Sequence, residues 1–145
     1  KITKKTAAAG FFITEINSPS VIAGQYKTSH IQYNPDHTVQ SITLNGYRSA
    51  NETITRSSSF QYNSFGQTTE IDGPLTTHND VTTLTYYECT TGEKCGQLAS
   101  ISNALHQTTS YDSYDDNGRI TQITSPLNVI TRYTYDSRGR ITTIS

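Results

Sequence analysis

The chain of 145 residues has neither methionine nor tryptophan, and it has only two cysteines and four prolines. Charged residues make up 16% of it, and the formal net charge is −1. A chain so nearly neutral offers no basic footprint for nucleic acid or an anionic membrane surface. No apolar run approaches the roughly 20 residues that a membrane-spanning helix needs. We therefore expect neither nucleic-acid binding nor a membrane span.

Residues with small hydroxyl or β-branched side chains are abundant, whereas charged and long aliphatic residues are few. The sequence contains 25 threonines, 16 serines, 14 isoleucines and 10 tyrosines, against only 6 leucines. β-branched and aromatic residues fit a pleated, half-buried surface better than a helix. The composition predicts an all-β protein with little or no helix, and a first strand around Phe11 to Ile16.

A phrase of the form Tyr-Asp-x-x-Gly-Arg-Ile-Thr occurs twice near the end of the chain, starting at Tyr114 and again at Tyr135. A repeat spacing of 20 to 50 residues is typical of an array of small structural units. Within the phrase, an aspartate that accepts bonds from backbone amides and a glycine that takes positive φ predict a hairpin turn. The predicted turn residues are Asp115, Gly118, Arg119, Asp136, Gly139 and Arg140.

Weaker copies precede these two. Tyr62, Asn63 and Gly66 repeat the turn with Asn for Asp and Gln for Arg, and residues 33–38 form a degenerate copy. Polar, proline-containing connections at 72–75 and 125–128 predict strand ends, because proline cannot donate to a ladder. We divide the chain into degenerate β repeats at 1–59 and a more regular array at 60–145.

One copy is enlarged. Eight residues separate Tyr87 from Gly96, and the insert carries Cys89 and Cys95, the only cysteines of the chain. A disulfide across the base of such a hairpin is favoured over a reduced pair, and it predicts an oxidising compartment.

The alternation within the strands is imperfect, because Ile120 and Ile123 lie three residues apart, as do Ile141 and Ile144. On an ideal strand the two members of each pair would face opposite sides of the sheet. Either a β-bulge corrects the spacing or both faces of the sheet are partly covered.

The charged and aromatic residues of the repeat have a structural and a chemical interpretation. Asp115 with Arg119 fits a capped turn with an ion pair better than a catalytic pair, since a catalytic site is needed only once. Asp115 and Asp116 lack the further oxygen ligands of a calcium loop. The histidines, which are His30, His37, His78 and His106, show no metal-ligand spacing. We predict no catalytic, cofactor or metal site, and we interpret the tyrosines as packing residues with sugar binding as the alternative.

The repeated phrase, followed by a polar connection and Thr-x-Tyr-x-Tyr-Asp, resembles the YD repeat of bacterial Rhs proteins, which also occurs in toxin-complex subunits and teneurins. The resemblance is strong over 110–145, fair over 60–107 and slight before 59. It implies antiparallel hairpin repeats that form a ribbon-like, spiralling β-sheet around a hollow shell. In the bacterial members the shell resembles a container for a toxic polypeptide.

The sequence thus predicts a non-enzymatic structural wall of a secreted, cell-surface or periplasmic protein. Its expected partners are further YD repeats or copies of itself, bound through sheet edges, and an enclosed toxin polypeptide. The first alternative is a subunit of a self-assembling extracellular filament, because open sheet edges are templates for pairing. The second alternative is a carbohydrate-binding adhesin module.

Overall fold

The fold is known from a computed structural model, which describes residues 3–6, 12–89 and 92–145. Every regular element in these ranges is a β-strand. The chain divides into two compact units, Lys1–Asp80 and Val81–Ser145. No helix of the described residues is long and apolar enough to cross a membrane.

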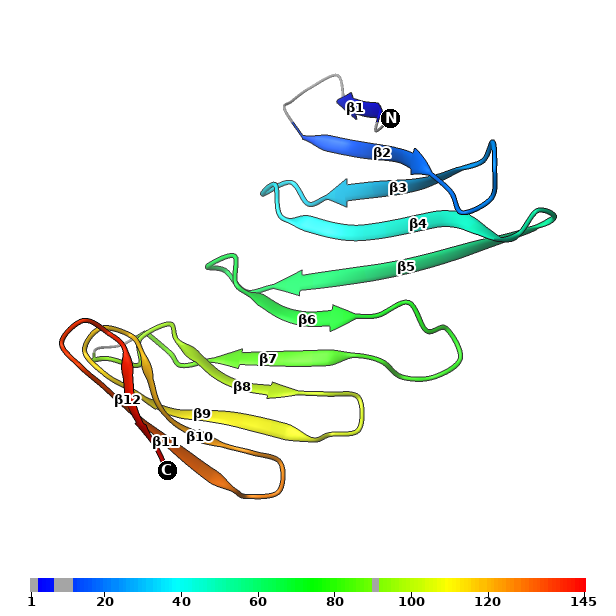
Figure 1. The fold of residues 1–145 in the computed structure, drawn as a ribbon. Helices are drawn as coiled ribbons and strands as arrows, with labels where there is room; N and C mark the ends of the chain where they lie inside the picture. The colour runs from blue at the N-terminus through cyan, green and yellow to red at the C-terminus, as the bar shows by residue number, and fades with distance from the viewer. Residues whose placement is uncertain (1–2, 7–11, 90–91) are drawn as a thin grey trace. The chain divides into compact units, whose positions relative to one another are not determined.

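The first unit is a meander of six strands, in which each strand pairs antiparallel with the next along the chain (Figure 1). Its longest ladder joins two eleven-residue strands and is continuous from Ser41 opposite Ser59 to Tyr47 opposite Thr53. The strands are β1 (Thr3–Thr6), β2 (Ile13–Pro19), β3 (Tyr26–Tyr33), β4 (Val39–Ser49), β5 (Glu52–Tyr62) and β6 (Thr68–Asp72).

The second unit repeats the same antiparallel plan with shorter strands (Figure 1). They are β7 (Thr82–Tyr86), β8 (Leu98–Ser102), β9 (Thr108–Tyr114), β10 (Ile120–Thr124), β11 (Ile130–Tyr135) and β12 (Ile141–Ile144). The all-β class and the succession of antiparallel hairpins are thereby confirmed.

β-Bulges account for the irregular isoleucine spacing. Tyr114 lies opposite Ile120, but Ser113 lies opposite Gln122, so Thr121 is an extra residue in β10. The same shift occurs in β12, where Tyr135 and Thr134 lie opposite Ile141 and Thr143. An extra residue after the first isoleucine lets the second return toward the same face of the sheet.

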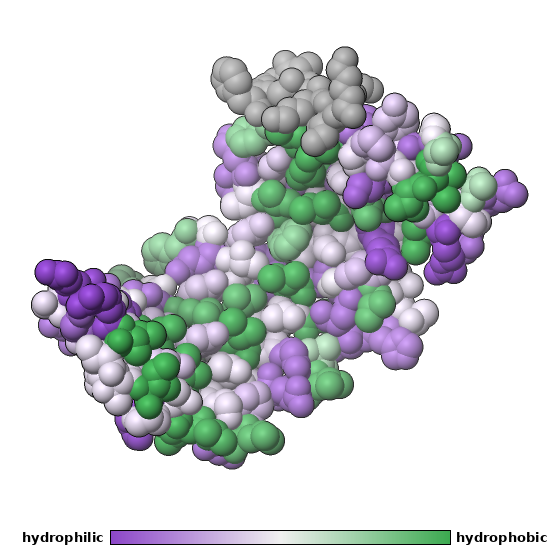
Figure 2. Space-filling view, in the orientation of Figure 1, coloured by the Kyte–Doolittle hydropathy of each residue, from purple (hydrophilic) through white to green (hydrophobic). Residues whose placement is uncertain are grey.

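The described part of the chain has little buried interior. Among the described hydrophobic residues only Tyr114 is buried, with 7% of its surface exposed. On the face seen in Figure 2, hydrophobic residues form small groups among polar ones. Backbone ladders and cross-strand pairs must therefore supply much of the stability.

Serine and threonine hydroxyls bond to one another across neighbouring strands. The pairs are Thr43–Ser57 at 3.0 Å, Thr85–Ser100 at 2.7 Å, Ser113–Thr121 at 2.7 Å and Thr134–Thr142 at 2.8 Å. These bonds give the abundant hydroxyl side chains a role in joining neighbouring strands.

Two boundaries expected from the sequence are the start of the first strand and the division between degenerate and regular repeats. Phe11, at the start of the first expected strand, lies outside the described residues, and β2 runs over Ile13–Pro19. The division between degenerate and regular repeats at 59 and 60 stays a prediction, since the boundary between compact units reflects contacts and not repeat type.

Candidate functional site

The turn at residues 115–119 defines a five-residue unit, here called the repeat turn. The Asp115 amide donates to the Arg119 carbonyl at 2.9 Å, and the Gly118 amide donates back to the Asp115 carbonyl at 2.8 Å. Gly118 has φ of 72°, a left-handed conformation that costs a glycine little. These two bonds bring the ends of β9 and β10 together.

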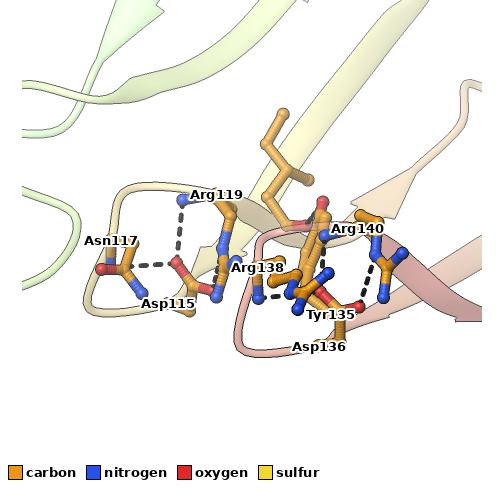
Figure 3. A network of polar contacts seen from close by, with 8 residues as sticks. Asp115, Asn117, Arg119, Tyr135, Asp136, Arg138 and Arg140 are labelled. Atoms are coloured by element: carbon orange, nitrogen blue, oxygen red, sulfur yellow. Dashed lines mark hydrogen bonds and ion pairs between the residues drawn. The ribbon is translucent and has the colours of Figure 1, made fainter.

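The Asp115 carboxylate fixes this turn from inside (Figure 3). Its Oδ1 atom accepts the amides of Asn117 at 3.0 Å and Arg119 at 2.9 Å. Its Oδ2 atom accepts the Arg119 Nε at 2.7 Å. The next turn is built alike, because Asp136 accepts the amides of Arg138 and Arg140 at 2.9 Å and the Arg140 Nε at 2.7 Å.

A neutral amide pair replaces the ion pair in an earlier copy. Asn63 Oδ1 accepts the amides of Phe65 and Gln67 at 3.0 Å, and Asn63 Nδ2 donates to Gln67 Oε1 at 2.8 Å. Gly66 takes φ of 77°. In these copies the side-chain oxygen of the first residue accepts the turn amides, and a charge on that residue is not needed.

The same turn also closes hairpins at the opposite ends of the strands, at 103–107 and at 125–129. The sequence indicated a polar connection at 125–128 and none at 103–107. In residues 103–107, Asn103 accepts the amides of Leu105 and Gln107 at 3.0 Å. In residues 125–129, Ser125 Oγ accepts the Val129 amide at 3.2 Å. The fourth residues, His106 and Asn128, take φ of 58° and 60°.

Sequence analysis missed the turn at 103–107 because a search for glycine at the fourth position passes over His106. A signal was present, since Asn103 and Gln107 repeat the spacing of Asn63 and Gln67. His37 also takes positive φ, 71°, in the degenerate copy at 34–38.

The enlarged turn keeps the same closure around its insert. The Tyr87 amide donates to the Gln97 carbonyl at 2.9 Å, and the Gly96 amide donates to the Tyr87 carbonyl at 3.2 Å. Tyr87 thus occupies the position that Asp115 holds in the regular turn. The register places Tyr86 opposite Leu98, as Tyr114 lies opposite Ile120, so Tyr86 is the counterpart of the repeat tyrosine.

A disulfide joins Cys89 to Cys95 within this insert. Residues 90 and 91 of the predicted insert lie outside the described residues. The Lys94 ammonium lies 4.9 Å from the centre of the Tyr87 ring. This cation–π interaction joins the insert to the base of the hairpin.

The repeat tyrosines connect each hairpin to the one before it. The Tyr114 hydroxyl donates to the Leu98 carbonyl at 2.7 Å, and the Tyr135 hydroxyl donates to the Ile120 carbonyl at 2.7 Å. In each case the acceptor residue lies opposite the tyrosine of the preceding hairpin. In the first unit, Tyr62 makes the equivalent bond to the Val39 carbonyl at 2.8 Å.

The fifth residue of two turns in the second unit adds a further connection. The Arg119 guanidinium lies over the Tyr135 ring at 4.6 Å, and a Cβ atom at Gly139 would approach Arg119 Nη1 to 3.1 Å. A Cβ atom at Gly118 would likewise lie 2.8 Å from Gln97 Nε2. Glycine at the fourth position therefore serves the backbone and also the close approach of the preceding turn.

The tyrosine environment favours packing over an exposed aromatic surface. Tyr87 donates to the Tyr111 carbonyl at 3.0 Å, and Tyr111 and Tyr133 are half-buried. Burial in this cluster raises the pKa of Tyr114, and interactions with Tyr87 and Tyr111 act in the same direction.

The electrostatics of the turn carboxylates oppose general-acid chemistry. The hydrogen bond that the Arg119 backbone amide donates is the main cause that lowers the pKa of Asp115 from its ordinary value of 3.8. The hydrogen bond from the Arg140 backbone amide does the same for the pKa of Asp136. The Thr38 hydroxyl, with its amide, lowers the pKa of Asp36. A general acid at neutral pH requires a raised pKa, whereas these carboxylates are held ionised.

Three of the four histidines have defined surroundings in the structure. The described residues contain no group of three or more His, Cys, Asp or Glu side chains arranged to hold a metal ion. His78 Nδ1 shares a hydrogen bond with Thr77 Oγ1 at 2.9 Å. His37 and His106 serve as positive-φ turn residues.

Comparison with known proteins gives two findings. The RHS Repeat family model matches residues 96–127 and 114–145. The chain is also similar to a chain in the structure of a mutant Tc holotoxin pore of Photorhabdus luminescens, with 11% sequence identity and a TM-score of 0.39. That similarity covers 99% of this chain and 10% of the other, so this chain spans about a tenth of its length. No curated protein sequence matches the chain significantly.

Proposed function

We propose that this chain, which is a YD-repeat (Rhs-repeat) protein, forms part of a β-sheet wall that encloses or displays another polypeptide. The family match supports a structural role for the repeats. The enclosure of a toxin is the more specific part of the proposal. The wall would belong to a secreted or cell-surface protein, and the Cys89–Cys95 disulfide supports such an oxidising setting.

The observation that carries the proposal is the connection between successive hairpins in the second unit. The Tyr135 hydroxyl and the Arg119 guanidinium both bridge the last two repeat turns. Both groups are thus occupied in joining one repeat to the next. Because the same contacts recur from hairpin to hairpin, they support a role in extending a sheet.

Coverage by a neighbouring hairpin lowers the exposure of the turn arginine. The Arg119 side chain, covered by the following hairpin, is 29% exposed, whereas Arg140, in the equivalent position, is 71% exposed. A further YD repeat that placed a tyrosine over Arg140 would reproduce the Arg119–Tyr135 contact.

Protection of an enclosed polypeptide tests the proposal. The polypeptide that carries this chain is expressed in its secreting host and treated with a broad-specificity protease under native conditions, and the surviving fragments are identified by mass spectrometry. We expect the repeats and a second, non-repeat segment to survive together, and the second segment to be digested once the sheet is unfolded. Digestion of every non-repeat segment under native conditions would overturn the enclosure proposal.

A filament subunit is the second candidate, because an antiparallel sheet can extend by pairing its edge strands with those of another copy. Ile141 and Ile144 of β12 are 52% and 63% exposed, and an apolar edge is a template for pairing with another chain. Light scattering of the purified chain separates the two candidates. Open-ended assemblies that disappear in Ile144→Lys but persist in Ile130→Lys, which adds the same charge to the inner strand β11, would favour the filament. A monomer at all concentrations would exclude it.

A further inference from the structure

Gly46 lies in the interior of β4 at a position whose backbone does not require glycine. Its φ lies outside the left-handed range, and a Cβ atom there would meet only the Lys27 Cβ, at 3.8 Å. That distance is an ordinary contact, so an alanine side chain would fit. Because glycine weakens a strand interior, another reason for its presence is needed.

The absent side chain leaves a hollow on one face of the first unit. A cleft of about 340 Å³ lies there, with Leu44 and Ile54 among its lining residues. Gly46 is directly opposite Ile54, and Leu44 is directly opposite Arg56, so these four residues form two adjacent cross-strand rows. Residues 19–21, which end β2 and begin its connection to β3, line the cleft as well.

The cleft is basic, although the chain as a whole carries a net charge of −1. Its lining includes Lys27, Arg48 and Arg56. Arg48 is paired with Glu52 at 2.9 Å. Within the described residues, no carboxylate lies within 4.0 Å of the Lys27 or Arg56 cationic groups.

An apolar hollow with two uncompensated cations selects a particular ligand chemistry. The cations attract a single anionic group, and a guanidinium can bind a carboxylate or sulfonate through two parallel hydrogen bonds. The apolar lining favours a hydrophobic body beside that group. The volume lies near the lower end of the usual range for ligand pockets, about 300 to 1,000 Å³, which limits the ligand to a small molecule.

We propose that this cleft binds a small amphipathic anion, an organic acid whose anionic group contacts Lys27 and Arg56 and whose apolar body lies over Gly46. This site is independent of the wall function, since its residues belong to the first unit and the repeat turns that carry that proposal belong to the second.

A pair of fluorescent probes tests the ligand chemistry. Anilinonaphthalene sulfonate is an amphipathic anion, and N-phenylnaphthylamine is its uncharged analogue. Titrated into the 145-residue chain, the anion should saturate at one probe per chain and bind at least about tenfold more tightly than the analogue, as expected for a charge-assisted contact. Higher salt should weaken binding of the anionic probe and leave binding of the uncharged analogue unchanged. Equal affinity of the two probes, or no saturable binding, would overturn the proposal.

Variants locate the site. Arg56→Gln and Lys27→Gln should each weaken anion binding about five- to tenfold and leave the uncharged probe unaffected. The control Arg132→Gln removes one positive charge from β11 in the second unit and should change neither probe. Equal weakening by Arg132→Gln and Arg56→Gln would show that net charge alone attracts the probe, and would contradict the site.

Filling the hollow separates binding from folding. Gly46→Val places a β-branched side chain over the cleft floor, so it should abolish anion binding while the sheet melts at an equal or higher temperature. In amide NMR spectra of the unchanged chain, the anion should shift the signals of Gly46 and Ile54 and leave those of β9–β12 in place. Undiminished binding to a folded Gly46→Val variant, or shifts confined to the second unit, would refute the assignment.

Discussion

Tyr114→Phe removes one hydroxyl from the most buried described residue and leaves its ring in place. The hydroxyl donates to the Leu98 carbonyl at 2.7 Å, and 7% of the residue is exposed. Loss of a hydrogen bond costs about 0.5 to 1.5 kcal/mol, and a partly buried acceptor without its donor adds to that figure. We therefore expect the second unit to lose about 1 to 2 kcal/mol of stability.

Hydrogen exchange with mass spectrometry measures this loss in the second unit alone. An effect of about 1 to 2 kcal/mol corresponds to about 5- to 30-fold more frequent opening. The increase should appear in peptides from β8, β9 and β10, while peptides from β3, β4 and β5 serve as the internal reference. Exchange is the suitable assay because amides report local opening, whereas a global melting curve averages both units.

The matched control is Tyr133→Phe. Tyr133 is half-buried on β11, and within the described residues its hydroxyl makes no hydrogen bond. Its removal should change stability by less than about 0.5 kcal/mol. If both variants opened equally often, or if Tyr114→Phe left exchange in β8 unchanged, the claim that repeat tyrosines fasten each hairpin to the preceding one would be refuted.

Three further predictions concern the turns. The pKa values of Asp115 and Asp136 are lowered in the folded state, so the stability that these carboxylates contribute should be present above pH 3.8 and fade as the pH falls below it. In an acid titration followed by circular dichroism, the stability of the Asp→Asn double variant should depend less on pH than that of the parent. Gly118→Ala should cost about 1 kcal/mol or more in urea unfolding because φ is 72°, whereas Gly118→Asn should cost less, and equal costs would contradict the backbone argument. Replacing Cys89 and Cys95 by serine should cost about 2 kcal/mol from loop-closure entropy, measured against the oxidised parent, and no change would argue against the disulfide in solution.

The local part of the fold could be predicted from the sequence because its causes are local. A capping oxygen at Asp115 or Asn63 and a glycine three residues later are adjacent in the chain, and they determine a turn by themselves. The match of the RHS Repeat model to 96–127 and 114–145 supports the family resemblance that the turns at Asp115 and Asp136 indicate. The turn at 103–107 escaped because His106 adopts a conformation for which glycine is the usual signal.

The connections between hairpins could not be predicted because they join residues that are distant in the sequence. The bonds from Tyr114 to Leu98 and from Tyr135 to Ile120 depend on strand register, which the bulges shift by one residue. Register also determines which of Tyr86 and Tyr87 is the repeat tyrosine, since both precede the enlarged turn. The spacing in the sequence identified the enlarged turn, but only the β7–β8 register shows which residue takes each position of the repeat.

The placement of Gly46 is a further case in which sequence alone was uninformative. A glycine in a strand pattern indicates a bulge or a close approach of another backbone. The structure shows neither reason at this position, and it places Lys27 and Arg56, which are remote in sequence, around the same hollow.

Electron cryomicroscopy of the polypeptide that carries this chain tests the central claim most directly. The account predicts successive hairpins side by side in a continuous sheet, with tyrosine density reaching the carbonyl of the preceding hairpin and a second polypeptide segment against one face. Hairpins closed into a separate barrel or sandwich, or a sheet with both faces in solvent, would contradict the wall.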